Sequence, residues 1–133
     1  MISEKWLPLF LRVVGCVTLL AFAAAVMPQK WIVEIAEELG FEPFPHAPLT
    51  FYLARNLSLL YGFVGCFLLI VASDLKRYRP LVRLTAIGTI AFGVLQWIVD
   101  AQSDMPLWWT AYESLSTIAG GIMIAILDRR TPT

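Results

Sequence analysis

Apolar residues fill four long stretches of this chain, and short polar segments separate them. The stretches cover about residues 7–27, 49–73, 81–99 and 107–127. Each has about the 20 mostly apolar residues that a helix needs to cross a bilayer. The sequence shows no alternating pattern of a membrane β-barrel. In lipid the backbone N–H and C=O groups must be hydrogen-bonded within the protein, so the stretches are expected to be helices. The pattern predicts an all-α fold: an integral membrane bundle of four transmembrane helices that forms one domain over residues 1–133.

The segment after the first apolar stretch has the pattern of an amphipathic helix. Over about residues 29–39, Trp31, Ile35 and Leu39 fall on one helical face and glutamates fall on the opposite face. Gly40 supplies a natural stop. The segment is too short to span a bilayer, so we expect an outer interfacial helix with its apolar face buried and its glutamates in water.

Composition and charge point to the same class of protein. Hydrophobic residues make up 59% of the chain, above the roughly 45–50% of ordinary soluble domains. The formal net charge is zero, but most cations lie at one side of the predicted spans: Lys5, Arg12, Lys76, Arg77, Arg79, Arg83, Arg129 and Arg130. The positive-inside rule therefore places both termini and a loop at residues 74–80 in the cytoplasm.

The opposite side of the predicted membrane protein is acidic. This distribution argues against nucleic acid as a partner.

Arg12 interrupts the apolar run that a cleaved signal peptide would need, so we expect the first helix to be retained. We expect no metal site and no cofactor, because His46 is the only histidine and Cys16 and Cys66 lie apart from it inside spans.

Small residues recur at four-residue spacing in three of the predicted spans. Such stripes let helix backbones approach closely in a membrane. The members are Ala54, Ser58, Gly62 and Cys66 in the second span, Thr85, Thr89 and Gly93 in the third, and Thr117, Gly121 and Ala125 in the fourth. The stripes predict a compact bundle.

Two opposite charges lie inside the predicted spans at similar depth. At about 1.5 Å of rise per residue, Arg55 is roughly 10 Å into the second span and Glu113 roughly 9 Å into the fourth. A charge is costly in hydrocarbon, so we expect Arg55 to pair with Glu113 or with Asp100, which ends the third span. The flanking aromatic residues of the same patch are Tyr52, Trp97 and Trp109.

This patch admits several functions, and no diagnostic catalytic motif decides among them. An ion pair could fix helix order alone. Alternatively, Arg55 could hold the anionic or polar head of a small amphipathic ligand while aromatic rings hold its body, or the protein could act as an accessory subunit through this patch. Asp100 and Glu113 could also act as acid and base on a lipid or isoprenoid substrate. A transport pathway would require an oligomer. The partners we expect are membrane lipids, a small amphipathic ligand, and a second copy or a partner membrane subunit.

Two runs of the sequence suggest a family. The run FPHAPLTFYLARNLSLLYG at residues 44–62 and the run MPLWWTAYES at residues 105–114 resemble small bacterial four-helix membrane proteins that are broadly similar to the DoxX-like proteins. The resemblance implies a four-helix bundle in the bacterial inner membrane. It brings no substrate and no catalytic residue with it, since fold alone does not define activity.

Overall fold

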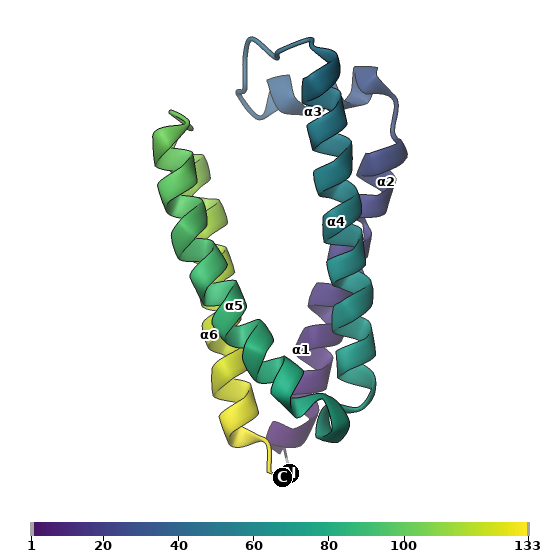
Figure 1. Ribbon diagram of the computed structural model, residues 1–133, viewed down its shortest axis with the longest axis vertical. Helices are drawn as coiled ribbons and strands as arrows, with labels where there is room; N and C mark the ends of the chain where they lie inside the picture. Colours follow the sequence, from purple (N-terminus) through teal and green to yellow (C-terminus); the bar gives the residue numbers. More distant parts are fainter. Residues whose placement is uncertain (1, 133) are drawn as a thin grey trace. The chain divides into compact units, whose positions relative to one another are not determined.

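The computed structural model describes residues 2–132, which form six α-helices and no β-strand (Figure 1). In chain order they are α1 (Ile2–Leu19), α2 (Ala21–Val26), α3 (Gln29–Glu38), α4 (Pro48–Ser73), α5 (Leu75–Gln102) and α6 (Leu107–Arg130). The helices belong to two compact units. One unit contains residues 2–11 and 71–132, and the other contains residues 12–70.

Four helical segments are long and apolar enough to cross a membrane. They are Glu4–Val26, Pro48–Ser73, Leu75–Gln102 and Leu107–Arg130. The predictions of an all-α fold and of four potential spans are therefore confirmed. The first segment is interrupted at Leu20, where α1 ends and α2 begins after a single residue in a turn.

The prediction of a loop at residues 74–80 is wrong. Only Asp74 separates α4 from α5, and its side chain caps the new helix by accepting from the backbone N–H of Arg77 at 3.1 Å. Pro80 lies inside α5 and removes one backbone hydrogen bond. The polar and proline residues of this segment thus form the first turns of a helix.

The segment predicted as an amphipathic helix is α3, and the predicted stop is confirmed. Gly40 adopts a φ of 90°, and the backbone N–H groups of Gly40 and Phe41 donate to the carbonyls of Glu37 and Ala36. This pair of bonds is a Schellman motif, which needs the left-handed conformation that glycine adopts without strain.

The apolar face of α3 was expected to lie against lipid or against the bundle, and the protein itself does not cover it, so burial in lipid stays a prediction. Trp31, Ile35 and Leu39 are 57%, 47% and 44% exposed. The half-buried apolar positions are instead Ile32, Val33 and Ala36. The face that carries Trp31 is therefore not covered by the protein itself.

In the unit of residues 12–70, glycines of α4 make close contacts with α1 and α2. A Cβ atom on Gly65 would lie 2.7 Å from the carbonyl oxygen of Gly15, and one on Gly62 would lie 2.5 Å from the ring of Phe22. The small-residue stripe of the second predicted span therefore receives a neighbouring helix at Gly62.

In the other unit, α5 and α6 form an antiparallel hairpin with a narrow seam. The seam positions on α5 recur with alternating spacings of four and three: Val82, Ala86, Thr89, Gly93, Gln96 and Asp100. Those on α6 follow the same rule: Thr110, Ser114, Thr117, Gly121, Ile124 and Asp128. All are buried or half-buried. This is the heptad spacing of a left-handed helix pair, but most of its residues are small or polar.

Two glycines fix how α5 and α6 lie along each other. A Cβ atom on Gly93 would lie 2.6 Å from the side chain of Ile118, and one on Gly121 would lie 2.7 Å from that of Ile90. One glycine from each of the predicted small-residue stripes therefore accommodates an isoleucine of the other helix. At the turn between the helices, Asp104 adopts a φ of 53°, a conformation that aspartate tolerates better than most residues.

Candidate functional site

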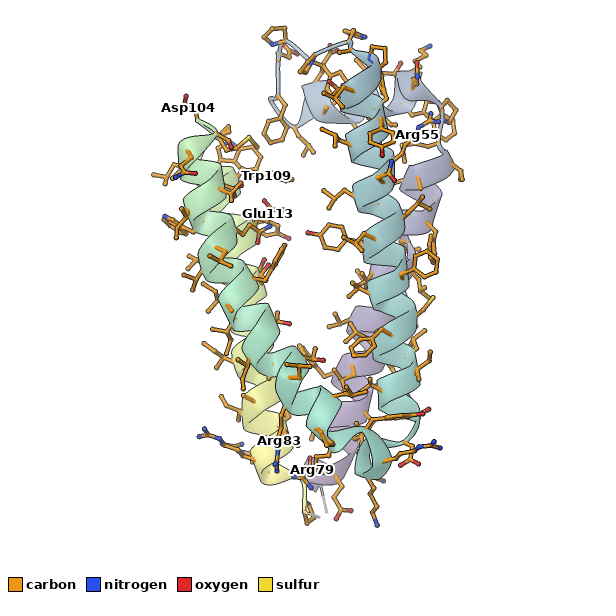
Figure 2. All side chains as sticks on the ribbon, in the orientation of Figure 1. Arg55, Arg79, Arg83, Asp104, Trp109 and Glu113 are labelled. Carbon is orange, nitrogen blue, oxygen red and sulfur yellow. The ribbon has the colours of Figure 1, made fainter. Side chains whose placement is uncertain are left out.

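The seam of the α5–α6 hairpin ends, next to its turn, in a group of polar side chains. We name Gln96, Asp100, Trp109, Glu113 and Ser114 the carboxyl cluster. Trp109 and Glu113 are one turn apart on α6 and therefore lie on the same side of that helix (Figure 2). Gln96 and Asp100 are one turn apart on α5. The hairpin thus brings two carboxyl groups from different helices together.

The carboxyl groups of Asp100 and Glu113 lie close enough to affect each other electrostatically. The side chain of Glu113 lies within hydrogen-bonding reach of Asp100 and of Trp109. The indole N–H of Trp109 can only donate, so it serves as a donor to the Glu113 carboxylate. Ionised carboxylates only accept, so a close pair is satisfied when one group carries a proton or when a cation or donor joins them.

Several polar atoms of the carboxyl cluster are buried without a partner. Asp100 is 9% exposed and Ser114 is fully buried. Within residues 2–132, Oδ2 of Asp100, Oε1 of Gln96 and Oγ of Ser114 have no hydrogen-bond partner. Buried polar atoms are usually paired, so the oxygens of Asp100 and Gln96 mark a place where a donor is needed, while the Ser114 hydroxyl can donate or accept.

Trp97 lies beside this cluster without being part of its buried core. It precedes Asp100 by three residues on α5 and is 37% exposed, whereas Trp109 is half-buried. One unit therefore holds four of the six predicted site residues: Asp100, Glu113, Trp97 and Trp109.

The other two predicted site residues, Arg55 and Tyr52, belong to the unit of residues 12–70. Arg55 donates from Nη2 to the carbonyl oxygen of Met27 at 3.2 Å. Met27 ends α2, so Arg55 caps one of the carbonyls that a helix C-terminus leaves free. Its Nε is buried without a partner among residues 2–132. Tyr52 is largely exposed, and the pairing of Arg55 with Glu113 or Asp100 stays a prediction.

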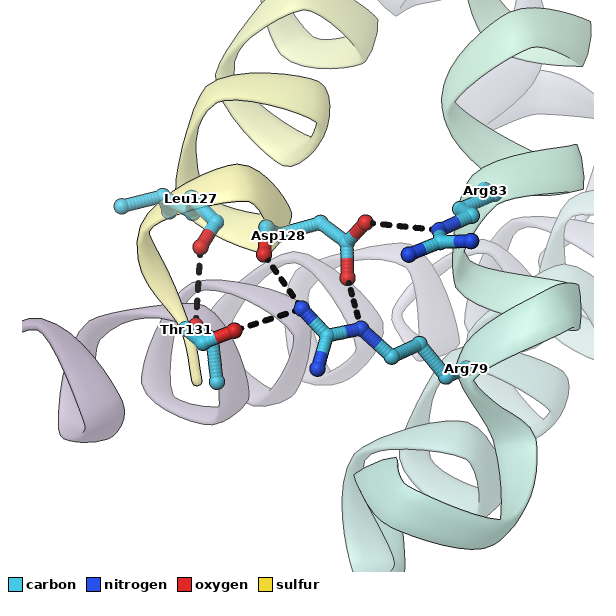
Figure 3. A network of polar contacts seen from close by, with 5 residues as sticks. All are labelled: Arg79, Arg83, Leu127, Asp128 and Thr131. Carbon is cyan, nitrogen blue, oxygen red and sulfur yellow. Dashed lines mark hydrogen bonds and ion pairs between the residues drawn. The ribbon is translucent and has the colours of Figure 1, made fainter. Parts of the chain in front are cut away.

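Sequence reasoning missed a second polar network, at the opposite end of the α5–α6 hairpin (Figure 3). The Asp128 carboxylate accepts from Nε of Arg79 at 3.0 Å and from Nε of Arg83 at 3.1 Å. Nη2 of Arg79 also donates to the backbone carbonyls of Asp128, at 2.8 Å, and Thr131. We name Arg79, Arg83, Asp128 and Thr131 the arginine clamp.

The arginine clamp covers the C-terminal end of α6. Arg79 donates to the carbonyl of Thr131 and adds a second donor to the Asp128 carbonyl, which also accepts from the backbone N–H of Thr131. The Thr131 hydroxyl donates to the carbonyl of Leu127. Asp128 is nearly buried, and Arg79 is 18% exposed at its side chain. One sequence signal could have found the clamp: Asp128 continues the four-and-three spacing of α6, which places it on the buried seam.

Residues 2–132 contain no group of three or more His, Cys, Asp and Glu side chains placed to hold a metal ion. Both cysteines are free thiols. The polar groups that the two networks bring together are carboxyl groups, arginines, hydroxyls, one amide and one indole. Of these, the carboxyl cluster offers buried acceptors and the arginine clamp offers exposed donors.

Known proteins add no further constraint on the function. The chain was compared with protein-family models, with curated proteins and with solved structures. No family model matches it, and neither a curated protein nor a solved structure matches it. The resemblance to DoxX-like proteins therefore stays an expectation from the two sequence runs that suggested it.

Proposed function

We propose that this protein is a multi-pass membrane protein that binds a small amphipathic ligand at the carboxyl cluster. One observation carries the proposal. Asp100 is nine-tenths buried, has an oxygen without a partner among residues 2–132, and lies beside a second carboxyl group. Such an arrangement is costly in a bilayer unless a donor or a cation completes it.

The proposed topology places the carboxyl cluster toward the outer side. Within the α5–α6 hairpin, Asp100 and Asp104 lie near the turn, while Arg79, Arg83 and Arg129 lie at the opposite end. With the arginines in the cytoplasm, both chain termini are cytoplasmic as well. The resemblance to small bacterial membrane proteins suggests the inner membrane as the location.

The chemistry of the carboxyl cluster favours a ligand head that donates hydrogen bonds. Asp100, Glu113 and Gln96 offer acceptor oxygens, which suit an amine or a hydroxyl. The neighbouring rings of Trp97 and Trp109 suit an apolar body. An anionic head would instead require Arg55, which belongs to the other unit.

A second candidate function is acid–base catalysis on a lipid or isoprenoid substrate. The observation that favours it is the interaction between two carboxyl groups of unequal burial, because unlike environments separate the roles of acid and base. Glu113 is half-buried and Asp100 is buried. In this case the same ligand head would be the reacting group.

The proposal can be tested with small amphiphiles of one chain length and different heads. The purified protein is placed in phosphatidylcholine nanodiscs and titrated with hexylamine, hexanol and hexanoate while tryptophan emission is recorded. We expect hexylamine or hexanol to bind and hexanoate not to bind. Trp109→Phe should remove most of the emission change, because Trp109 contacts Glu113.

Matched variants give the test its control. Asp100→Asn removes the buried charge and should weaken hexylamine binding by about tenfold or more, as expected for a lost charged hydrogen bond. Asp104→Asn removes an exposed charge at the same turn and should leave binding unchanged. Unchanged binding in Asp100→Asn would overturn the proposal. Lipid products that form with the protein but not with Glu113→Gln would favour the catalytic candidate.

A further inference from the structure

A groove runs along the α5–α6 hairpin beside the arginine clamp. Its volume is about 490 Å³, and its lining combines cations, one carboxylate and apolar side chains: Arg79, Arg83, Arg129, Asp128, Ala86, Ile87 and Ala125. Three arginines and a single carboxylate leave the lining with two net positive charges. Because both oxygens of Asp128 are already engaged by Arg79 and Arg83, the remaining charge has no counterion in the groove.

Asp128 orients Arg83 without using up its donors. Arg83 gives only its Nε–H to Asp128, at 3.1 Å, and its side chain is 63% exposed. A guanidinium carries five N–H donors in a fixed fork, so four remain to face an anion. Within residues 2–132, the side chain of Arg129 forms no hydrogen bond, and the residue is exposed on the last turn of α6. The groove therefore presents two arginines that can meet one phosphate.

The rest of the groove is apolar. Ala86, Ile87 and Ala125 lie one to two turns from the arginines along their helices, and Ile87 is 68% exposed. An inorganic anion would use only the arginines. A phospholipid would use the arginines for its head and the apolar strip for its acyl chain.

We propose that this groove binds the phosphodiester head of an anionic phospholipid, with one acyl chain along Ala86, Ile87 and Ala125. The inference rests on the proposed insertion into a membrane. Arginine matches phosphate oxygens in a planar, bidentate way. Basic pockets between helices at the cytoplasmic surface are suited to such heads. The clamp supplies the rigidity: Asp128 holds Arg83 in place before the lipid arrives.

The test uses the full chain in nanodiscs and native mass spectrometry of bound lipids. Nanodiscs contain phosphatidylcholine with or without phosphatidylglycerol, and a third sample contains phosphatidylcholine with inorganic phosphate. We expect phosphatidylglycerol to be retained in preference to phosphatidylcholine and to raise the melting temperature. Equal protection by inorganic phosphate would identify a free-anion site and overturn the phospholipid assignment.

Paired variants separate the groove from the general basic surface. The double variant Arg83→Gln with Arg129→Gln should weaken phosphatidylglycerol binding about 25-fold, at roughly fivefold for each arginine near a membrane surface. The control is Arg77→Gln with Arg130→Gln, which makes the same change in net charge outside the groove lining and should keep the preference. Arg83→Lys with Arg129→Lys should restore part of the binding. Equal losses in the groove variant and the control would overturn the inference.

Insertion into a membrane is tested separately. Protein that alkaline carbonate extracts from membranes would sink the proposed function itself. Protein that stays in membranes but shows no preference for phosphatidylglycerol would overturn only the inference that the groove binds an anionic phospholipid. Circular dichroism of each variant checks that the helices are intact, so that a lost preference reports on the lipid site.

Discussion

Arg79 and Asp128 are joined twice, once through side chains and once through the backbone. Nε of Arg79 donates to Oδ1 of Asp128 at 3.0 Å, and Nη2 donates to the Asp128 carbonyl at 2.8 Å. The residues are 49 positions apart in the chain. A single guanidinium therefore fastens α5 to the end of α6 and also caps that end.

Asp128→Ala should destabilise the fold by roughly 3 kcal/mol or more, because it leaves the nearly buried Arg79 without its carboxylate. Asp128→Asn keeps an acceptor and should cost less. Thermal unfolding in a neutral detergent would measure both. Glu38→Ala, at an exposed position of α3, is the control and should stay within about 0.5 kcal/mol of the parent. If Asp128→Ala and the control both lowered the free energy of unfolding by a similar small amount, the arginine clamp would not stabilise the fold as predicted.

Gly121→Ala should destabilise the α5–α6 hairpin by about 1–3 kcal/mol through overpacking. The added Cβ would lie 2.7 Å from the side chain of Ile90 and 2.9 Å from the carbonyl oxygen of Ala86. Gly120→Ala is a matched control in the same helix, because a Cβ there meets nothing within 4 Å. It should be neutral or stabilising by up to about 1 kcal/mol through helix propensity. A Gly121→Ala variant that is more stable than the Gly120→Ala variant would contradict the close contact of α5 and α6 at Gly121.

Gly65→Ala tests the contact between α1 and α4 in the same way. Its Cβ would lie 2.7 Å from the Gly15 carbonyl and 2.8 Å from the backbone nitrogen of Leu19, neither of which can rotate away. We expect a loss of about 1–3 kcal/mol. Gly88→Ala, which meets nothing within 4 Å, is the control. Equal melting temperatures of the two variants would rule out the close approach at Gly65.

A double-mutant cycle tests whether Arg55 pairs with Glu113. Arg55→Met and Glu113→Gln should each destabilise the protein, and the double variant should recover much of the loss, which gives a coupling of about 1 kcal/mol or more. Chemical or thermal unfolding of the four proteins provides the energies. Losses that add within about 0.5 kcal/mol would leave the Met27 carbonyl as the sole partner of Arg55.

Cysteine labelling tests the proposed topology. Cys16 and Cys66 are first replaced by alanine, and single cysteines are then introduced at Arg77 and Glu38. An impermeant thiol reagent applied to intact cells should label position 38 and not position 77, because the cation-rich side faces the cytoplasm. Labelling of position 77 alone would show that the protein has the orientation opposite to the proposed one.

Local sequence signals predicted the helices well where the cause is local. The end of α3 follows from Gly40, because a Schellman motif involves only the residues around it. The start of α5 was missed because Lys76, Arg77 and Pro80 resemble a polar loop in composition. The cap that turns them into a helix depends on one side chain, Asp74.

The carboxyl cluster was predicted in part, and the arginine clamp was not. Asp100, Trp109 and Glu113 were found because charged and aromatic residues inside spans are conspicuous. Asp128 was overlooked because the α5–α6 seam is small and polar, so it leaves no apolar stripe to follow. Arg83 was counted only among the cations of the cytoplasmic side, since a partner 45 positions away in the chain has no local signature.

The seam between α5 and α6 has a further consequence for how the hairpin chooses its alignment. In a bilayer, apolar side chains gain nothing by leaving lipid for a neighbouring helix. Sliding α6 by one heptad, about 10 Å, would still leave a helix of similar apolarity facing α5. It would, however, carry Asp128 away from Arg79 and Arg83, and it would separate Gly121 from Ile90. The buried residues Asp100 and Asp128, together with Gly93 and Gly121, thus fit only one alignment of α6 along α5. Apolar packing alone could not select that alignment.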